Sequence, residues 1–136
     1  MPDSVVVHVD GGARGNPGPA AVAAVATAPG GSVLGERSAY IGEATNNVAE
    51  YRAVLLGLEL ARSLGARSLE VVNDSELVAR QIGGQYRVKQ EHLKPLYGEV
   101  MDALRGFHGW QVRSVRREHN VRADELVNEA LDARSG

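Results

Sequence analysis

Four acidic residues occupy positions in the sequence where catalytic carboxylates are commonly found. Asp10 ends a β-branched run, Glu50 lies about one turn into an expected helix, Asp74 follows a second apolar run, and Asp124 begins the last helical pattern. Strand ends and helix starts gather at the edges of an α/β sheet, so these acids could meet there. Carboxylates are the oxygen ligands that Mg²⁺ prefers. Two such ions about 4 Å apart can hold the attacking and leaving oxygens of an in-line phosphoryl displacement.

Each acid taken alone has a simpler interpretation. Asp74 and Asp124 could cap the helices that follow them, because aspartate is a favourable N-cap residue. Glu50 could be a solvated helix residue, and Asp10 could stabilise the glycine-rich turn after it. Spacing does not show that the four side chains converge, so both interpretations stay open from these residues alone.

The pattern of apolar residues predicts the elements that would position these acids. Strands are expected at residues 5–10, 20–28, 33–41, 68–73 and 110–115. Helices are expected at residues 46–64, 75–82, 93–104 and 123–133. Glycine and proline indicate a loop at residues 11–19. The first three strands can form an antiparallel meander and the later two can return through helices, which predicts an α/β fold with a five-stranded mixed sheet and helices on both faces.

Composition limits the class of protein. The chain has 136 residues, of which 43% are hydrophobic and 24% charged, so it suits one globular domain rather than a disordered or coiled-coil chain. The absence of cysteine excludes disulfides, cysteine-bound zinc and a thiol nucleophile, and is compatible with a cytoplasmic location. Residues 1–9 do not resemble a signal peptide, and the most apolar stretch, residues 20–28, is too short to span a membrane.

The net charge of −2, from 15 Lys and Arg against 17 Asp and Glu, is lower than nucleic-acid-binding proteins usually carry. The charges are, however, unevenly placed. Without the four acids above, 13 acids stand against 15 bases, and residues 105–122 hold five arginines against one acid, Glu118. The net charge therefore does not exclude a polyanionic substrate, although it favours weak, salt-sensitive binding.

The four acids lie in short motifs that resemble those of type 1 ribonuclease H. Residues 9–20 read VDGGARGNPGPA and residues 45–50 read TNNVAE. Residues 73–75 read NDS and residues 123–126 read ADEL. Four motifs in the family's order are far more specific than one, and the resemblance runs over essentially the whole chain.

The resemblance implies a ribonuclease H-like fold and a metal-dependent endoribonuclease that hydrolyses the RNA strand of RNA–DNA hybrids, leaving 5′-phosphate and 3′-hydroxyl ends. It implies two Mg²⁺ ions, with Mn²⁺ as substitute, held by the catalytic carboxylates Asp10, Glu50, Asp74 and Asp124. The residues that it implies for contacts with the hybrid are Gly11, Gly12, Asn16, Thr45, Asn46 and Asn47. The 2′-hydroxyl in the minor groove would distinguish RNA from DNA there. Thr45 would help to hold a phosphate near a helix N-terminus, although it and both asparagines are also good capping residues.

Two features resemble the archaeal and actinobacterial branch of this family. The best-known bacterial members carry an auxiliary histidine in a loop well before the last aspartate, whereas His119 is only five residues before Asp124. Either His119 or Arg117 could take the auxiliary role, and a surface loop imidazole is the simpler interpretation of His119. Residues 83–92 are also too short for the family's basic protrusion, which Arg87, Lys89 and Lys94 could partly replace.

Two other kinds of function stay open beside this one. A junction resolvase or a DNA exonuclease could use the same fold, and a non-catalytic module could bind hybrids without cutting them. We expect residues 1–136 to form a single catalytic domain, which could be cut from a longer protein. We expect a monomer with an RNA–DNA hybrid as its partner, without an obligate protein partner or a membrane.

Overall fold

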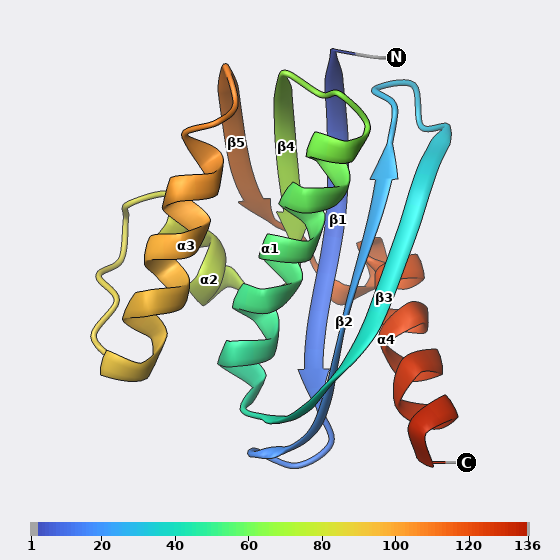
Figure 1. The fold of residues 1–136 in the computed structure, drawn as a ribbon, viewed down its shortest axis with the longest axis vertical. Coiled ribbons are helices and arrows are strands. Elements are labelled where there is room, and N and C mark those ends of the chain that lie inside the picture. Colours follow the sequence, from blue (N-terminus) through green and yellow to red (C-terminus); the bar gives the residue numbers. More distant parts are fainter. Residues whose placement is uncertain (1–2, 136) are drawn as a thin grey trace.

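The structure, a computed structural model, describes residues 3–135, so Met1, Pro2 and Gly136 of the expected domain lie outside the described residues. One five-stranded sheet runs through it, in the order β3-β2-β1-β4-β5 (Figure 1). Its strands are β1 (Ser4–Ala13), β2 (Gly18–Thr27), β3 (Val33–Ala44), β4 (Ser68–Asn73) and β5 (Gly109–Ser114). The first three are antiparallel, while β4 adds in parallel to β1 and β5 in parallel to β4. The predicted mixed sheet is confirmed.

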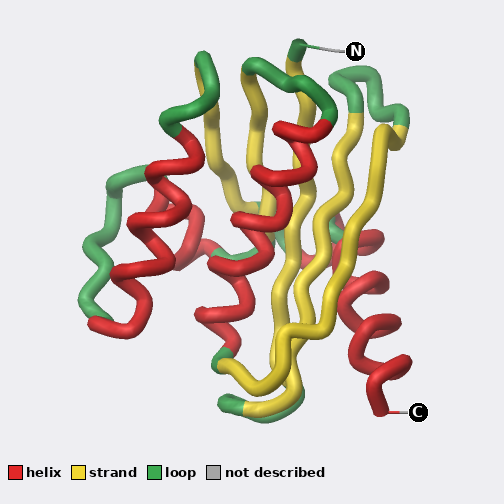
Figure 2. The backbone as a smooth tube through the Cα atoms, in the orientation of Figure 1, coloured by secondary structure: helices red, strands yellow, loops and turns green. Residues whose placement is uncertain are grey.

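Helices cover both faces of this sheet (Figures 1 and 2). They are α1 (Asn46–Ser63), α2 (Glu76–Ile82), α3 (Lys94–Leu104) and α4 (Val121–Ser135), with short 3₁₀ turns at Glu91–Leu93 and Arg117–His119. The first three lie on one face and α4 lies on the other. Residues 83–90 contain no helix, as expected for a chain without the basic protrusion. Within residues 3–135, no helix has both the length and the apolar character needed to cross a membrane.

Alternating side chains on the central strands fill two cores. On β1, Val5, Val7 and Val9 are buried in the core beneath α1. On β2, Ala21 and Ala23 belong to the core beneath α4, whose own contribution includes Leu126, Val127 and Leu131. The residues that alternate with these valines, Val6, His8 and Asp10, therefore face α4.

The expected end of β1 at Asp10 is wrong. The strand continues to Ala13, because Gly11, Gly12 and Ala13 pair with β2 opposite Val22, Ala21 and Ala20. Only residues 14–17 form the loop between β1 and β2. Glycine favours turns when the sequence is considered locally, but here an adjacent strand satisfies its backbone groups, and that neighbour is not visible in the local pattern.

The helix α1 packs unusually close to β1. Gly57 faces the strand, and a Cβ atom at this position would lie 2.6 Å from Val9 Cγ1 and 2.7 Å from Val7 Cγ1. Real carbon atoms do not approach so closely, so any side chain here would push the helix from the sheet. This close packing fixes the distance between the helix that carries Glu50 and the strand that carries Asp10.

We therefore expect Gly57→Ala to lower the free energy of unfolding by about 1–3 kcal/mol through overpacking. Gly98→Ala is the matched control, since a Cβ there meets no atom within 4 Å and the residue lies within α3. It should raise stability by about 0.5–1 kcal/mol, because alanine favours helix. Denaturant unfolding of both variants measures the difference, and equal effects would contradict the packing argument.

Candidate active site

The site forms where β4 stops pairing with β1. The last pair of that parallel ladder is His8 with Val72. Asp10 lies two residues further along β1, and Asp74 directly follows β4. Because β1 extends beyond its neighbour, side chains from the first turns of α1 and α4 can reach this edge. Four separate elements therefore supply Asp10, Glu50, Asp74 and Asp124.

The structure brings these acids to one cavity, of about 650 Å³. Asp10, Glu50 and Asp74 each offer a carboxylate oxygen, and these three atoms lie within 4.8 Å of one another. Asp10 is only 5% exposed and Glu50 only 8% exposed. Asp124 lines the same cavity from the first turn of α4. The simpler interpretation of Glu50 as a solvated helix residue is therefore wrong.

Burial and mutual repulsion disfavour the charged forms of these acids. Burial, followed by the charges of Asp74 and Asp124, raises the pKa of Asp10 to about 8. Burial, followed by the charges of Asp10 and Asp74, raises the pKa of Glu50 well above its ordinary value. A hydrogen bond from the Gly11 N–H to Glu50 opposes that rise only in part.

The carboxylates fit a hard divalent cation. Glu50 Oε2 is buried without a hydrogen-bond partner, which is a costly state for a carboxylate oxygen. A cation between Asp10, Glu50 and Asp74 would pair with this oxygen and remove the repulsion between the charges. An all-oxygen donor set matches the ligand preference of Mg²⁺ and Mn²⁺.

The asparagines expected to contact a hybrid also hold the site together. Asn46 Oδ1 accepts a hydrogen bond of 2.9 Å from the Ala13 N–H, and Asn16 Oδ1 accepts one of 3.0 Å from the Asn46 N–H. These bonds fasten the loop after β1 to the start of α1. Thr45 caps α1, since its hydroxyl accepts a hydrogen bond of 3.3 Å from the Val48 N–H.

Of the residues predicted to contact substrate, Gly11, Gly12, Asn46 and Asn47 line the cavity, whereas Asn16 and Thr45 are not among its lining residues. A Cβ at Gly11 would lie 2.2 Å from the backbone oxygen of Ala49, so this glycine allows α1 to cross β1 closely. All six contacts with substrate stay predictions.

The two auxiliary candidates lie in different places. Arg117 lines the acidic cavity, with its Nε 3.7 Å from Asp74 Oδ2. His119 lines a smaller cavity that is formed in part by His8 and Asn120. The structure thus places Arg117, and not His119, beside the carboxylates, while the auxiliary role of either residue stays a prediction.

Three residues of the site were missed from the sequence. Arg14 and Asn128 line the cavity. Asn120 is buried, and its Nδ2 donates a hydrogen bond of 2.8 Å to the backbone oxygen of Val9, next to Asp10. Its position four residues before Asp124 was the available signal, because an asparagine just before a helix has a polar side chain that commonly bonds to backbone.

The raised pKa of Asp10 predicts how stability varies with pH in the metal-free protein. The folded state binds this proton more tightly than the unfolded state, so the free energy of unfolding should fall as pH rises from 3.8, the ordinary pKa, to about 8. Asp10→Asn removes this loss and should raise stability at pH 8 in EDTA by about 1–2 kcal/mol, or about 3–8 °C in Tm.

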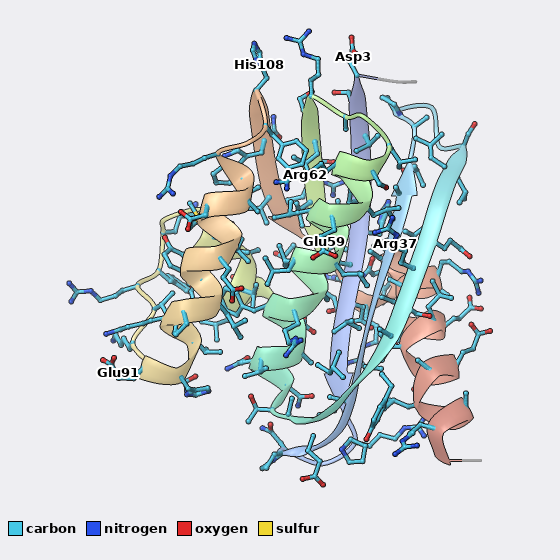
Figure 3. The ribbon with its side chains drawn as sticks, viewed as in Figure 1. Asp3, Arg37, Glu59, Arg62, Glu91 and His108 are labelled. Atoms are coloured by element: carbon cyan, nitrogen blue, oxygen red, sulfur yellow. The ribbon has the colours of Figure 1, made fainter. Side chains whose placement is uncertain are left out.

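Thermal unfolding at pH 5 and pH 8, with EDTA and with millimolar Mg²⁺, measures this effect. Mg²⁺ should abolish the advantage of Asp10→Asn, because the cation stabilises the intact carboxylates. Glu59→Gln is the control, since Glu59 lies on the exposed, outer face of α1 (Figure 3) and should behave like the parent protein in every buffer. An Asp10→Asn variant less stable than the parent in EDTA at pH 8 would refute the repulsion.

Comparison with known proteins agrees with the fold. Residues 8–130 match the family model described as "Reverse transcriptase-like". The chain is 45% identical over 130 residues to a bifunctional protein of Mycobacterium tuberculosis, covering 95% of this chain but only 36% of that protein. It is 41% identical over 128 residues to ribonuclease HI of Halobacterium salinarum, covering 94% of this chain and 64% of that protein.

A solved structure of a similar protein has the same fold. The crystal structure of LC11-RNase H1 in complex with an RNA/DNA hybrid superposes with a TM-score of 0.93 at 43% identity, covering 97% of this chain and 99% of that chain. The match includes the sheet and the elements that carry the four acids. The chain belongs to the type 1 ribonuclease H family.

Proposed function

We propose that this chain is a metal-dependent endonuclease that hydrolyses the RNA strand of RNA–DNA hybrids. The observation that carries the proposal is the convergence of Asp10, Glu50 and Asp74, with one buried Glu50 oxygen lacking a partner. Such a site suits a cation-assisted phosphoryl displacement. Support for the substrate comes from the family, whose LC11 member is solved with an RNA/DNA hybrid.

In this proposal the four carboxylates hold two Mg²⁺ ions, for which Mn²⁺ can substitute. When bound, these ions would supply an activated water and charge stabilisation for the leaving 3′-oxygen, which would give 5′-phosphate and 3′-hydroxyl ends. The chain contributes the placement of the charges. Gly11 orients Glu50 through its N–H, and Asn120 ties the start of α4 to β1. Because Asp10 has a raised pKa, metal binding would displace a proton from the site.

The residues that line the cavity beside the acids are suited to reading a nucleic acid strand. Asn46 and Asn47 stand at the first turn of α1, and Gly12 leaves room for a backbone to approach. An amide side chain can both donate to and accept from a 2′-hydroxyl. Selection of RNA over DNA would follow from this pairing.

Cleavage of an end-labelled RNA–DNA hybrid with Mg²⁺ tests the proposal. We expect the RNA strand to be cut, and both Asp10→Asn and Glu50→Gln to lower the rate by more than about 100-fold, because each removes a metal ligand. Glu59→Gln should cut normally. Duplex DNA and a branched DNA junction are offered beside the hybrid. Preferred cutting of the junction would favour a resolvase, and tight hybrid binding without cleavage would favour a non-catalytic module.

The placement of Arg117 beside Asp74 predicts unequal roles for the two auxiliary candidates. We expect Arg117→Gln to lower kcat/KM for the hybrid by about 10-fold, because it removes the positive charge nearest the carboxylates. His119→Gln should change it by less than about 2-fold, because His119 lines a different cavity. Steady-state rates of both variants decide the matter, and a larger loss for His119→Gln would reverse the assignment.

A further inference from the structure

We infer that Arg14 binds a phosphate of the strand that is cut, and that Asp132 holds this guanidinium while no nucleic acid is bound. This inference rests on the proposed function, since it requires a nucleic acid strand in the acidic cavity. It assigns a binding role to a residue outside the acids, glycines and asparagines considered above.

Arg14 stands at the α4 side of the cavity. It begins the loop between β1 and β2 and is a lining residue of the cavity that holds the acids. Its Nη2 lies 2.7 Å from Asp132 Oδ1 and 3.4 Å from Asn128 Oδ1, both on α4. The side chain nevertheless keeps 44% of its surface exposed. The guanidinium is therefore held in place and still accessible from solvent.

The chain of contacts from Arg14 leads directly to the acids. Asn128 donates a hydrogen bond of 3.1 Å to the backbone oxygen of Asp124, whose side chain acts on Asp10. The negative charge of Asp74 repels that of Asp10, and Asp74 forms an ion pair with Arg117. Arg117 thus contacts the acids at Asp74, whereas Arg14 is connected to them through Asn128 on α4.

A polyanionic strand in this cavity needs positive charge beside the carboxylates. The phosphate above the carboxylates would be neutralised by bound cations, but its neighbours would meet no cation unless the protein supplies one. Arginine suits this task, because its planar guanidinium can bind phosphate through two parallel hydrogen bonds. Arg117 and Arg14 both line the cavity and carry this charge.

The present partner of Arg14 can be exchanged at little cost. Asp132 is 68% exposed, and exposed ion pairs contribute only about 0–1 kcal/mol. A phosphate can therefore replace Asp132 without a large penalty. Arg122 is a useful contrast, since it forms two hydrogen bonds with Glu36 and also contacts Glu125 and Glu129, away from the acidic cavity.

The competing explanation is that Arg14 merely fastens the loop to α4. Two substitutions break the same ion pair from opposite sides and separate the explanations. Arg14→Gln removes the phosphate ligand and the fastening together. Asp132→Asn removes the fastening but leaves Arg14 free to bind phosphate, and it also removes a competing negative charge.

Binding of a short RNA–DNA hybrid to both variants, each made in the Asp10→Asn background to prevent cleavage, tests the inference. At about 50 mM salt we expect Arg14→Gln to weaken binding by about 3–10-fold and to reduce the slope of log K against log salt by about one. Arg14→Lys should restore the slope because it keeps the charge. Asp132→Asn should bind as tightly as its parent or more tightly. Equal weakening by Arg14→Gln and Asp132→Asn, or no effect of Arg14→Gln, would overturn the inference.

Hybrids with one neutral methylphosphonate linkage identify the phosphate. A linkage in the RNA strand should weaken binding when Arg14 is present and have no effect on Arg14→Gln. The same pattern in the DNA strand would overturn the strand assignment. Cleavage by the unsubstituted chain is scored separately, so a protein that binds as expected but does not cut refutes the proposed function and leaves the Arg14 contact established.

Discussion

Repulsion among the carboxylates of one cavity is the constraint on which the rest of the structure depends. Asp10 and Glu50 are buried beside each other, with Asp74 and Asp124 near them, and the charges of these groups repel one another. Contacts outside these four carboxylates must therefore hold the site together. Gly57 lets α1 pack directly on β1, and the Asn120 side chain fastens α4 to the same strand. Packing thus holds the carboxylates in place against their repulsion, so a cation can bind them without further reorganisation of the protein.

The unequal lengths of neighbouring strands give the site its place. β1 pairs with β2 as far as Ala13, whereas its parallel pairing with β4 stops at His8. Residues beyond His8 therefore have a strand on one side only, and the first turns of α1 and α4 approach the other side. Gly11 makes this possible, because any larger residue would collide with the backbone at Ala49. A buried carboxylate on a central strand can reach a solvent-filled cavity only at such a point.

The sequence predicted the elements better than their ends or their contacts. Periodic apolar residues identify α1 and β4 almost to the residue, because those patterns depend on burial, which is local to each element. The length of β1 could not be predicted, since the pairing of Gly11 and Gly12 depends on β2. The acids were recognised through motifs, but their convergence depends on tertiary packing, which the local sequence does not show. Arg14 and Asn120 were missed because each interacts with a residue more than 100 positions away in the sequence. Arg14 pairs with Asp132, and Asn120 donates to the backbone oxygen of Val9.

The distribution of charge matters more to function than the net value of −2. Several arginines have acidic partners within the protein, and the partner determines whether the arginine remains usable. Arg122 forms ion pairs with Glu36, Glu125 and Glu129, so its charge is not available to a ligand. Among residues 3–135, Arg14 forms an ion pair with Asp132, which is mostly exposed, so this pair is weak. Exchange of such a weak internal pair for a phosphate gains a charge-assisted contact and frees a carboxylate that solvent can hydrate. A chain with a slight negative charge can therefore bind a polyanion, provided that the arginines with weakly bound acidic partners lie beside the cavity.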